Sequence, residues 1–185
     1  MNRKANLLAA AATLKAKGQQ GIPKVEGVDL MDRTLYLNVV ATGHGGTVDL
    51  VDANTVRDAG ITNLDGNKLN AGRDYVIDGI RLLNGGTTAN IKGETWVQDI
   101  LGNYPGALQN AEIVLEQDGN VLIDMPISDI VDTSSFEKFR SLSSTPLIRS
   151  NLEFTLKIVY PKGQTISGAA VKNIRFEFRV TQAKR

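Results

Sequence analysis

Near its C-terminal end the chain reads Leu152-Glu153-Phe154-Thr155-Leu156-Lys157-Ile158-Val159-Tyr160, and after a connection Asn173-Ile174-Arg175-Phe176-Glu177-Phe178-Arg179-Val180. Both stretches alternate apolar and polar side chains almost without a break. An alternation with a period of two is typical of an antiparallel strand that buries one face and keeps one polar face. The end of the chain therefore predicts two strands of an all-β fold.

The same period appears nearer the N-terminus. In residues 34–42 it places Leu35, Leu37 and Val39 on one face, and a glycine-rich turn leads to a second short strand at 47–51. The chain contains 18 glycines. Because glycine supplies the backbone conformations of tight turns, this number fits short strands better than long helices.

A further strand is predicted over residues 74–83, where the glycines after Asn84 end it. Strict alternation would divide its side chains between two faces. The two predicted sets are Val76, Ile80 and Leu82 on one face and Tyr75, Ile77 and Arg81 on the other.

One hairpin is predicted from its turn. Asp118-Gly119 separates the apolar runs 111–116 and 121–125, and Asp-Gly in this position is the strongest short-range hairpin signal. Short helical insertions are expected near 55–59 and within 128–140. Residues 94–101 fit either a short helix or a strand.

Roughly seven or eight strands with uneven connections favour an antiparallel β-sandwich, and a jelly roll fits better than an immunoglobulin-type sandwich. The chain has no cysteine, so it lacks the Cys…Trp…Cys pattern of antibody domains and has neither disulfides nor thiolate chemistry. Residues 33–185 are predicted to form a single β-sandwich domain, preceded by an N-terminal arm at 1–32.

The arm is predicted to contain a helix over residues 3–17, capped by Asn2 and ended by Gly18, with a linker at 19–32. A helix of this length is marginal in water, so we expect it to dock on its own body or on a neighbour. Its apolar stretch is far too short to span a bilayer. The predicted assembly residues of the arm are Arg3, Lys4, Leu7, Leu8, Leu14, Lys15 and Lys17.

Charge is unevenly distributed along a chain whose net charge is only +1. The first 17 residues carry basic side chains and no acid, acids dominate residues 49–132, and the chain ends in the basic tail Lys184 and Arg185. Basic ends on a nearly neutral body can contact an anionic surface such as nucleic acid or lipid headgroups. Ordinary solvated ends are the alternative interpretation.

No catalytic motif emerges from the sequence. The only histidine, His44, lies among glycines and is interpreted as a solvent-exposed turn residue, because a catalytic base needs an orienting partner. Neither a Gly-x-Ser-x-Gly elbow nor a phosphate-binding Gly-x-x-x-x-Gly-Lys motif is present. We therefore expect that the protein is not an enzyme and that it binds no cofactor and no small-molecule substrate.

An oxygen-rich loop is the only candidate for a metal. Asn63, Asp65, Asn67 and Asn70 offer oxygen atoms, but an EF-hand loop that begins at Asn63 would need glycine where Lys68 stands. These residues more readily build turns. No metal site is predicted, and a weak one in this loop stays open.

Two segments carry a family resemblance. Residues 74–83 are similar to the strand after the first long loop in jelly-roll capsid proteins of tailless, membrane-containing icosahedral phages. The closing pattern, Pro146-Leu147-Ile148-Arg149 followed by the strands at 152–160 and 174–180, also resembles that group. The chain has room for one jelly roll, so it resembles the single jelly-roll type.

The resemblance implies a structural virion protein that self-assembles into an icosahedral shell. Its partners would be itself and other capsid proteins and, through the basic termini, an internal membrane or the genome. It would be made in the host cytoplasm and located in the virion.

Two other functions remain open from the sequence. The first is a ligand- or carbohydrate-binding module, whose candidate aromatic residues are Trp96, Tyr104 and Tyr160. The second is a β-sandwich hydrolase with a pair of carboxylates, which sequence alone does not place at the required separation.

Overall fold

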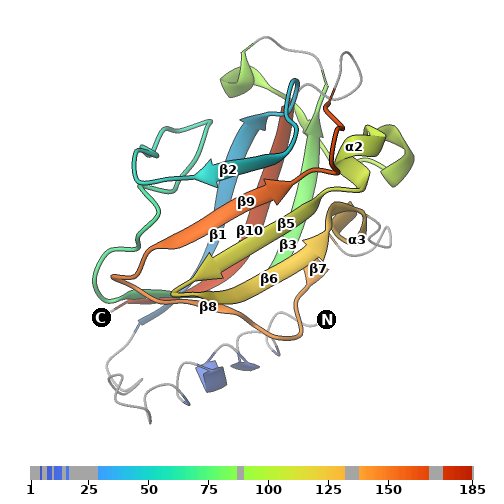
Figure 1. The fold of residues 1–185 in the computed structure, drawn as a ribbon. Coiled ribbons are helices and arrows are strands. Elements are labelled where there is room, and N and C mark those ends of the chain that lie inside the picture. Colours follow the sequence, from blue (N-terminus) through green and yellow to red (C-terminus); the bar gives the residue numbers. More distant parts are fainter. Residues whose placement is uncertain are drawn as a thin grey trace.

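The protein is a sandwich of two antiparallel sheets, seen in a computed structural model (Figure 1). The predicted all-β sandwich is thus confirmed. The structure describes residues 29–86, 90–131, 138–166 and 173–184, and near the N-terminus residues 5, 8, 9, 11–13 and 16.

Strands are the main regular structure of the described chain. They are β1 Asp29–Val40, β2 Thr47–Val51, β3 Arg73–Gly85, β4 Trp96–Val97, β5 Glu112–Gln117, β6 Asn120–Pro126, β7 Arg140–Ser141, β8 Leu147–Ile148, β9 Phe154–Val159 and β10 Asn173–Lys184. Short helices lie in the connections: η1 Ile91–Gly93, η2 Leu101–Asn103, α2 Gly106–Gln109 and α3 Ile127–Val131.

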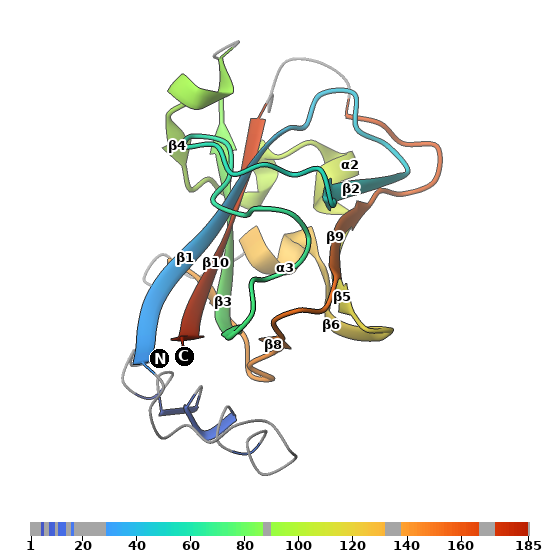
Figure 2. The same cartoon turned by 90° about the vertical axis from the view of Figure 1, so that its left-hand side faces the viewer.

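The strand order is that of a jelly roll. One sheet runs β1-β10-β3-β4, with β7 and β8 also paired to β3, and the other runs β2-β9-β5-β6. The antiparallel pairs are nested: β5 with β6, β3 with β7 and β8, β2 with β9, and β1 with β10. This is one long hairpin rolled into two layers, which Figure 2 shows from the side.

The core lies between the two layers. The inward face of β10 is formed by Ile174, Phe176, Phe178 and Val180, all buried as the alternation predicts. Facing it from the other sheet are Phe154, Leu156 and Ile158. The prediction for β1 is also confirmed, because Leu35 and Leu37 are buried and Val39 packs against the core.

The hairpin between β5 and β6 has the predicted turn. Asp118 and Gly119 both have positive φ, 53° and 70° respectively. Two successive residues with positive φ match the twist of the flanking strands in a two-residue hairpin turn, and Asp-Gly tolerates that conformation best. The local sequence is thus sufficient to form this turn.

The predicted faces of β3 are wrong because the strand contains a β-bulge. Val180 pairs with Ile77 but Arg179 pairs with Gly79, which leaves Asp78 as the extra residue. An extra residue shifts the alternation by one. Consequently Tyr75 and Ile77 lie in the same core as Ile80 and Leu82.

The structure also tests the predictions for the shorter segments. Helix α3, at Ile127–Val131, overlaps the start of the predicted 128–140 region, but residues 55–59 contain no helix, only a β-bridge at Asp58 and a turn at Ala59. The ambiguous segment 94–101 contains the short strand β4. The described residues between 5 and 16 are helical, as predicted for the arm, and β1 already begins at Asp29, inside the predicted linker.

We predict that Phe176→Ala lowers the free energy of unfolding by about 3–5 kcal/mol, because the side chain is fully buried and its removal leaves a cavity. Urea unfolding would measure the change. The control is Val56→Ala, at a side chain that is 71% exposed, where we expect a change within about 0.5 kcal/mol. Equal effects of the two substitutions would contradict the assigned core.

Candidate functional site

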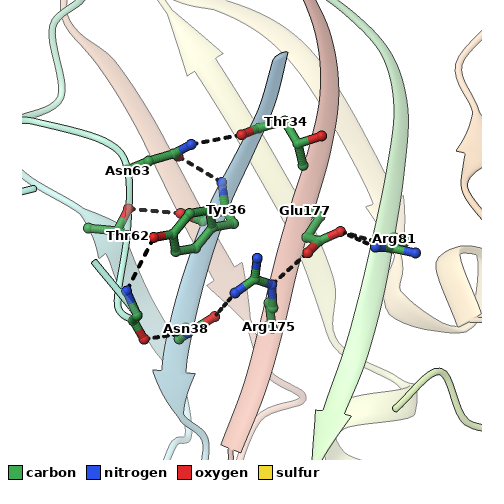
Figure 3. A network of polar contacts seen from close by, with 9 residues as sticks. Thr34, Tyr36, Asn38, Thr62, Asn63, Arg81, Arg175 and Glu177 are labelled. Atoms are coloured by element: carbon green, nitrogen blue, oxygen red, sulfur yellow. Dashed lines mark hydrogen bonds and ion pairs between the residues drawn. The ribbon is translucent and has the colours of Figure 1, made fainter. Parts of the chain in front are cut away.

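The outer face of the sheet formed by β1, β10 and β3 carries a continuous chain of polar contacts (Figure 3). We call it the outer-face network. It comprises Thr34, Tyr36, Asn38, Gly60, Thr62, Asn63, Arg81, Arg175 and Glu177. The polar face of β10 is therefore not open to solvent; Glu177 is only 5% exposed.

Glu177 is the centre of the network. One carboxylate oxygen accepts hydrogen bonds from Arg81, whose Nε lies 2.5 Å away, and the other accepts from Arg175 Nε at 2.6 Å. The ladder register places Glu177 directly opposite Arg81 on β3. Arg175 lies two positions away on β10, which puts it on the same face.

Arg175 extends the network to β1. Its Nη1 donates to Asn38 Oδ1 at 3.3 Å, and its guanidinium lies 4.1 Å from the centroid of the Tyr36 ring. Asn38 in turn donates to the carbonyl oxygen of Gly60 at 2.6 Å. A guanidinium that is stacked on a ring and hydrogen-bonded in its plane has little rotational freedom, so these contacts fix β1 against β10.

The segment 60–63 covers part of the edge of β1. Asn63 Oδ1 accepts from Tyr36 N at 2.9 Å, and Asn63 Nδ2 donates to the carbonyl oxygen of Thr34 at 2.7 Å. Thr62 Oγ1 donates to the carbonyl oxygen of Tyr36 at 2.9 Å. Side chains thus replace a neighbouring strand along the middle of β1, which protects that part of the edge from pairing with another chain.

The bulge in β3 builds a second ion pair on the same face. Asp78 is 2% exposed, and its Oδ1 accepts from Arg179 Nε at 2.6 Å. The guanidinium groups of Arg81 and Arg179 lie 4.5 Å and 5.2 Å from the centroid of the Phe139 ring. Gly79 makes room for this arrangement, since a Cβ there would meet Arg179 Nη2 at 3.1 Å.

These contacts give the face a structural character. Each of the two buried carboxylates is engaged by arginine, and each arginine also contacts an aromatic ring. Buried ion pairs with complete hydrogen bonding fix a geometry. The sequence shows the polar side chains of β10 but not this network, because their partners come from β1, β3 and the segment 60–63.

His44 is half-buried, so its interpretation as a solvent-exposed turn residue is wrong. Its Nδ1 lies 3.4 Å from the hydroxyl oxygen of Tyr160, and the two rings meet edge to face. Burial lowers the pKa of His44 and raises the pKa of Tyr160 to about 12. Both shifts favour the neutral forms, as expected for groups that pack against apolar surroundings.

The aromatic residues considered for ligand binding are mostly inaccessible. Tyr104 and Tyr160 are each only 3% exposed, and burial raises the pKa of the Tyr104 hydroxyl. Trp96 is partly buried, with its ring 6.0 Å from the guanidinium of Arg175. Of these three candidates, Trp96 is therefore the one that offers ring surface to a ligand.

The oxygen-rich loop is used for structure. Because the side chain of Asn63 is bound to β1 through both of its polar atoms, its oxygen is not directed at a metal. Within the described parts of the chain, no group of three or more histidine and acidic residues is arranged to hold a metal ion.

The structure describes only two of the predicted assembly residues, Leu8 and the backbone of Lys184. Leu8 is 63% exposed, and Lys184 ends β10, where it pairs with Asp29 and Arg73. Outside the described residues lie Arg3, Lys4, Leu7, Leu14, Lys15, Lys17 and Arg185.

Among the described residues of the arm, Thr13 makes a side-chain contact to the sandwich. The Thr13 hydroxyl oxygen is 3.3 Å from that of Thr145, in the segment before β8. Among the described helices, none is long and apolar enough to cross a membrane.

No model of a known protein family matches this chain, and no curated protein matches it.

We predict that Glu177→Gln lowers the free energy of unfolding by about 3 kcal/mol, because it leaves Arg81 and Arg175 without their carboxylate on a covered face. Chemical denaturation would measure the change. The matched control is Asp58→Asn, which removes an ion pair between two half-exposed side chains, and should cost no more than about 1 kcal/mol. A result for Glu177→Gln as small as that of the control would show that the network does not stabilise the sheet.

Stability should fall in mild acid because of His44. The unfolded chain binds a proton at this residue more readily than the folded chain, so its contribution is complete above the ordinary pKa of 6.5 and is lost as the pH falls below that value. We expect His44→Gln to lose less stability than the original protein between about pH 7.5 and about pH 5.5. Urea midpoints at both pH values test this, and parallel losses in the two proteins would contradict it.

Proposed function

We propose that the protein is a structural subunit that associates with copies of itself into a shell. The observation that carries this proposal is the complete nested jelly roll with a helical N-terminal segment beside one end of it (Figure 1). Jelly rolls form viral capsid domains and also lectin domains, so the fold by itself supports more than one function.

The arm favours assembly among these functions. Its described residues are helical, yet Leu8 is 63% exposed, and the side-chain hydrogen bond from these residues to the sandwich joins Thr13 to Thr145. A short helix gains most of its stability from packing an apolar face. A neighbouring subunit that covers Leu8 would supply that packing, as in the exchange of arms between subunits.

The more specific proposal is a capsid subunit of a tailless, membrane-containing icosahedral phage. It rests on the resemblance of residues 74–83 and of the closing strands to that group. Its partners would be other capsid proteins, and the basic termini would face the genome or an internal membrane.

A carbohydrate-binding module receives less support. Two of its three candidate aromatic residues, Tyr104 and Tyr160, are buried, and sugar rings need accessible aromatic faces.

The first test is the mass of the intact protein over a range of concentrations, by light scattering with negative-stain imaging. Closed symmetric oligomers or shell fragments are the expected result. A strict monomer at the highest concentration, together with binding to glycans, would overturn the proposal in favour of the binding module.

We predict that deletion of residues 1–17 leaves the sandwich folded but weakens self-association. Replacing Leu8 with Ser should raise the concentration needed for assembly by roughly tenfold, since burial of one leucine contributes about 1.5–3 kcal/mol. Light scattering measures that concentration, and circular dichroism checks the fold. The control is Val56→Ser, at a similarly exposed apolar side chain in the sandwich. If the truncated chain assembles as well as the intact one, the arm has no role in assembly.

A further inference from the structure

A small basic cavity lies where β1, the connection between β2 and β3, and the start of β3 meet. Its volume is about 100 Å³, and its lining includes Arg33, Arg57, Lys68 and Arg73. Asp65 is the one acidic residue of the lining. The cavity therefore gathers four cations against a single carboxylate.

Arg33 is held in place by neutral groups. Its Nη1 donates to the Tyr75 hydroxyl oxygen and to Gln182 Oε1, both at 3.1 Å. Tyr75 is 4% exposed and Gln182 is 3% exposed, so both acceptors belong to the packed interior. They orient the guanidinium without neutralising its charge.

Within the described part of the chain, the four cations lack the carboxylate partners that other arginines have. Arg81, Arg175 and Arg179 each pair with a carboxylate on the outer face. None of the four cations of the cavity forms an ion pair with a carboxylate in the described part of the chain. Arg33 and Arg73 are partly buried, whereas Arg57 and Lys68 are exposed. Because like charges gathered at one cavity repel each other, a bound anion would lower the electrostatic cost of this arrangement.

The backbone around the cavity is fixed by pairing. Lys68 forms an antiparallel bridge with Glu153, and Arg73 is the first residue of β3, opposite Lys184 in the ladder. Gly66, at φ 73°, turns the chain between these positions and donates its N–H to the carbonyl oxygen of Thr55 at 2.6 Å. The cations therefore project from a preformed frame, which reduces the entropy lost on binding.

We infer that this cavity binds a phosphate group. At about 100 Å³ it is smaller than the roughly 300 Å³ at which pockets for whole organic ligands begin, so it suits one anionic group. Guanidinium groups match the oxygen atoms of phosphate with paired hydrogen bonds, and a lysine adds a point charge. The group is either a free phosphate ion or one phosphodiester of a nucleic-acid strand, and the inference does not rest on the proposed shell.

The test is titration calorimetry of the full chain with inorganic phosphate, with sodium chloride at equal ionic strength as the reference. We expect saturable binding of phosphate and none of chloride. The double substitution Arg57→Gln with Lys68→Gln should weaken binding by roughly tenfold or more, since each hydrogen bond to a charged group contributes about 1.5–3 kcal/mol. The matched control is Lys138→Gln with Lys162→Gln, which removes the same charge from exposed positions elsewhere.

Arg33→Gln should weaken phosphate binding further, but it also removes the hydrogen bonds to Tyr75 and Gln182 and so can disturb folding. The double variant keeps the test valid in that case, because the side chains of Arg57 and Lys68 make no hydrogen bond to the described residues. A short oligothymidylate distinguishes the sources of the phosphate. Tighter binding than phosphate, with a steep salt dependence and the same loss in the variants, would assign a nucleic-acid backbone; binding of phosphate alone would assign the free ion. Identical heats for phosphate and chloride, or unchanged affinity in the double variant, would overturn the inference.

Discussion

The whole structure depends on the pairing of β10 on both of its edges. As the last strand of the chain, it lies between β1 and β3 and contributes Phe176 and Phe178 to the core. Since β1 and β10 are the first and last strands in the sequence, the sheet forms only when the two ends of the sandwich sequence have come together. The jelly roll therefore consists mainly of contacts between residues distant in sequence, which makes its folding slow relative to helical proteins.

The polar side chains on the outer face of β10 also need hydrogen-bond and charge partners. In this protein the network around Glu177 and the pair between Arg179 and Asp78 provide these partners, with Tyr36 and Phe139 stacked on the arginines. Buried ion pairs contribute little net stability compared with apolar packing, but breaking one is costly. These ion pairs instead specify the register of β10, because a shift of β10 by one residue would turn Glu177 towards the core.

The two charged regions of the sandwich have different roles. The outer-face network pairs its charges and fixes the sheet, whereas the four cations of the cavity around Arg33 form no ion pair with a carboxylate of the described chain. The arm contacts the sandwich through Thr145 and leaves Leu8 exposed. Both proposed binding regions, the arm and the cavity, lie outside the packed core, in keeping with the rule that function resides in sites added to a fold and not in the fold itself.

The sequence alone determined the fold class, the buried faces of β1, β9 and β10 and the turn at Asp118-Gly119, because each follows from a local period or a local backbone preference. Only the tertiary structure decided the faces of β3, because the bulge at Asp78 arises from pairing with β10 and leaves no periodic signal. The burial of His44, the network around Glu177 and the cavity at Arg33 likewise could not be predicted. Each joins residues that are far apart in the sequence, and their proximity exists only once the strands have paired.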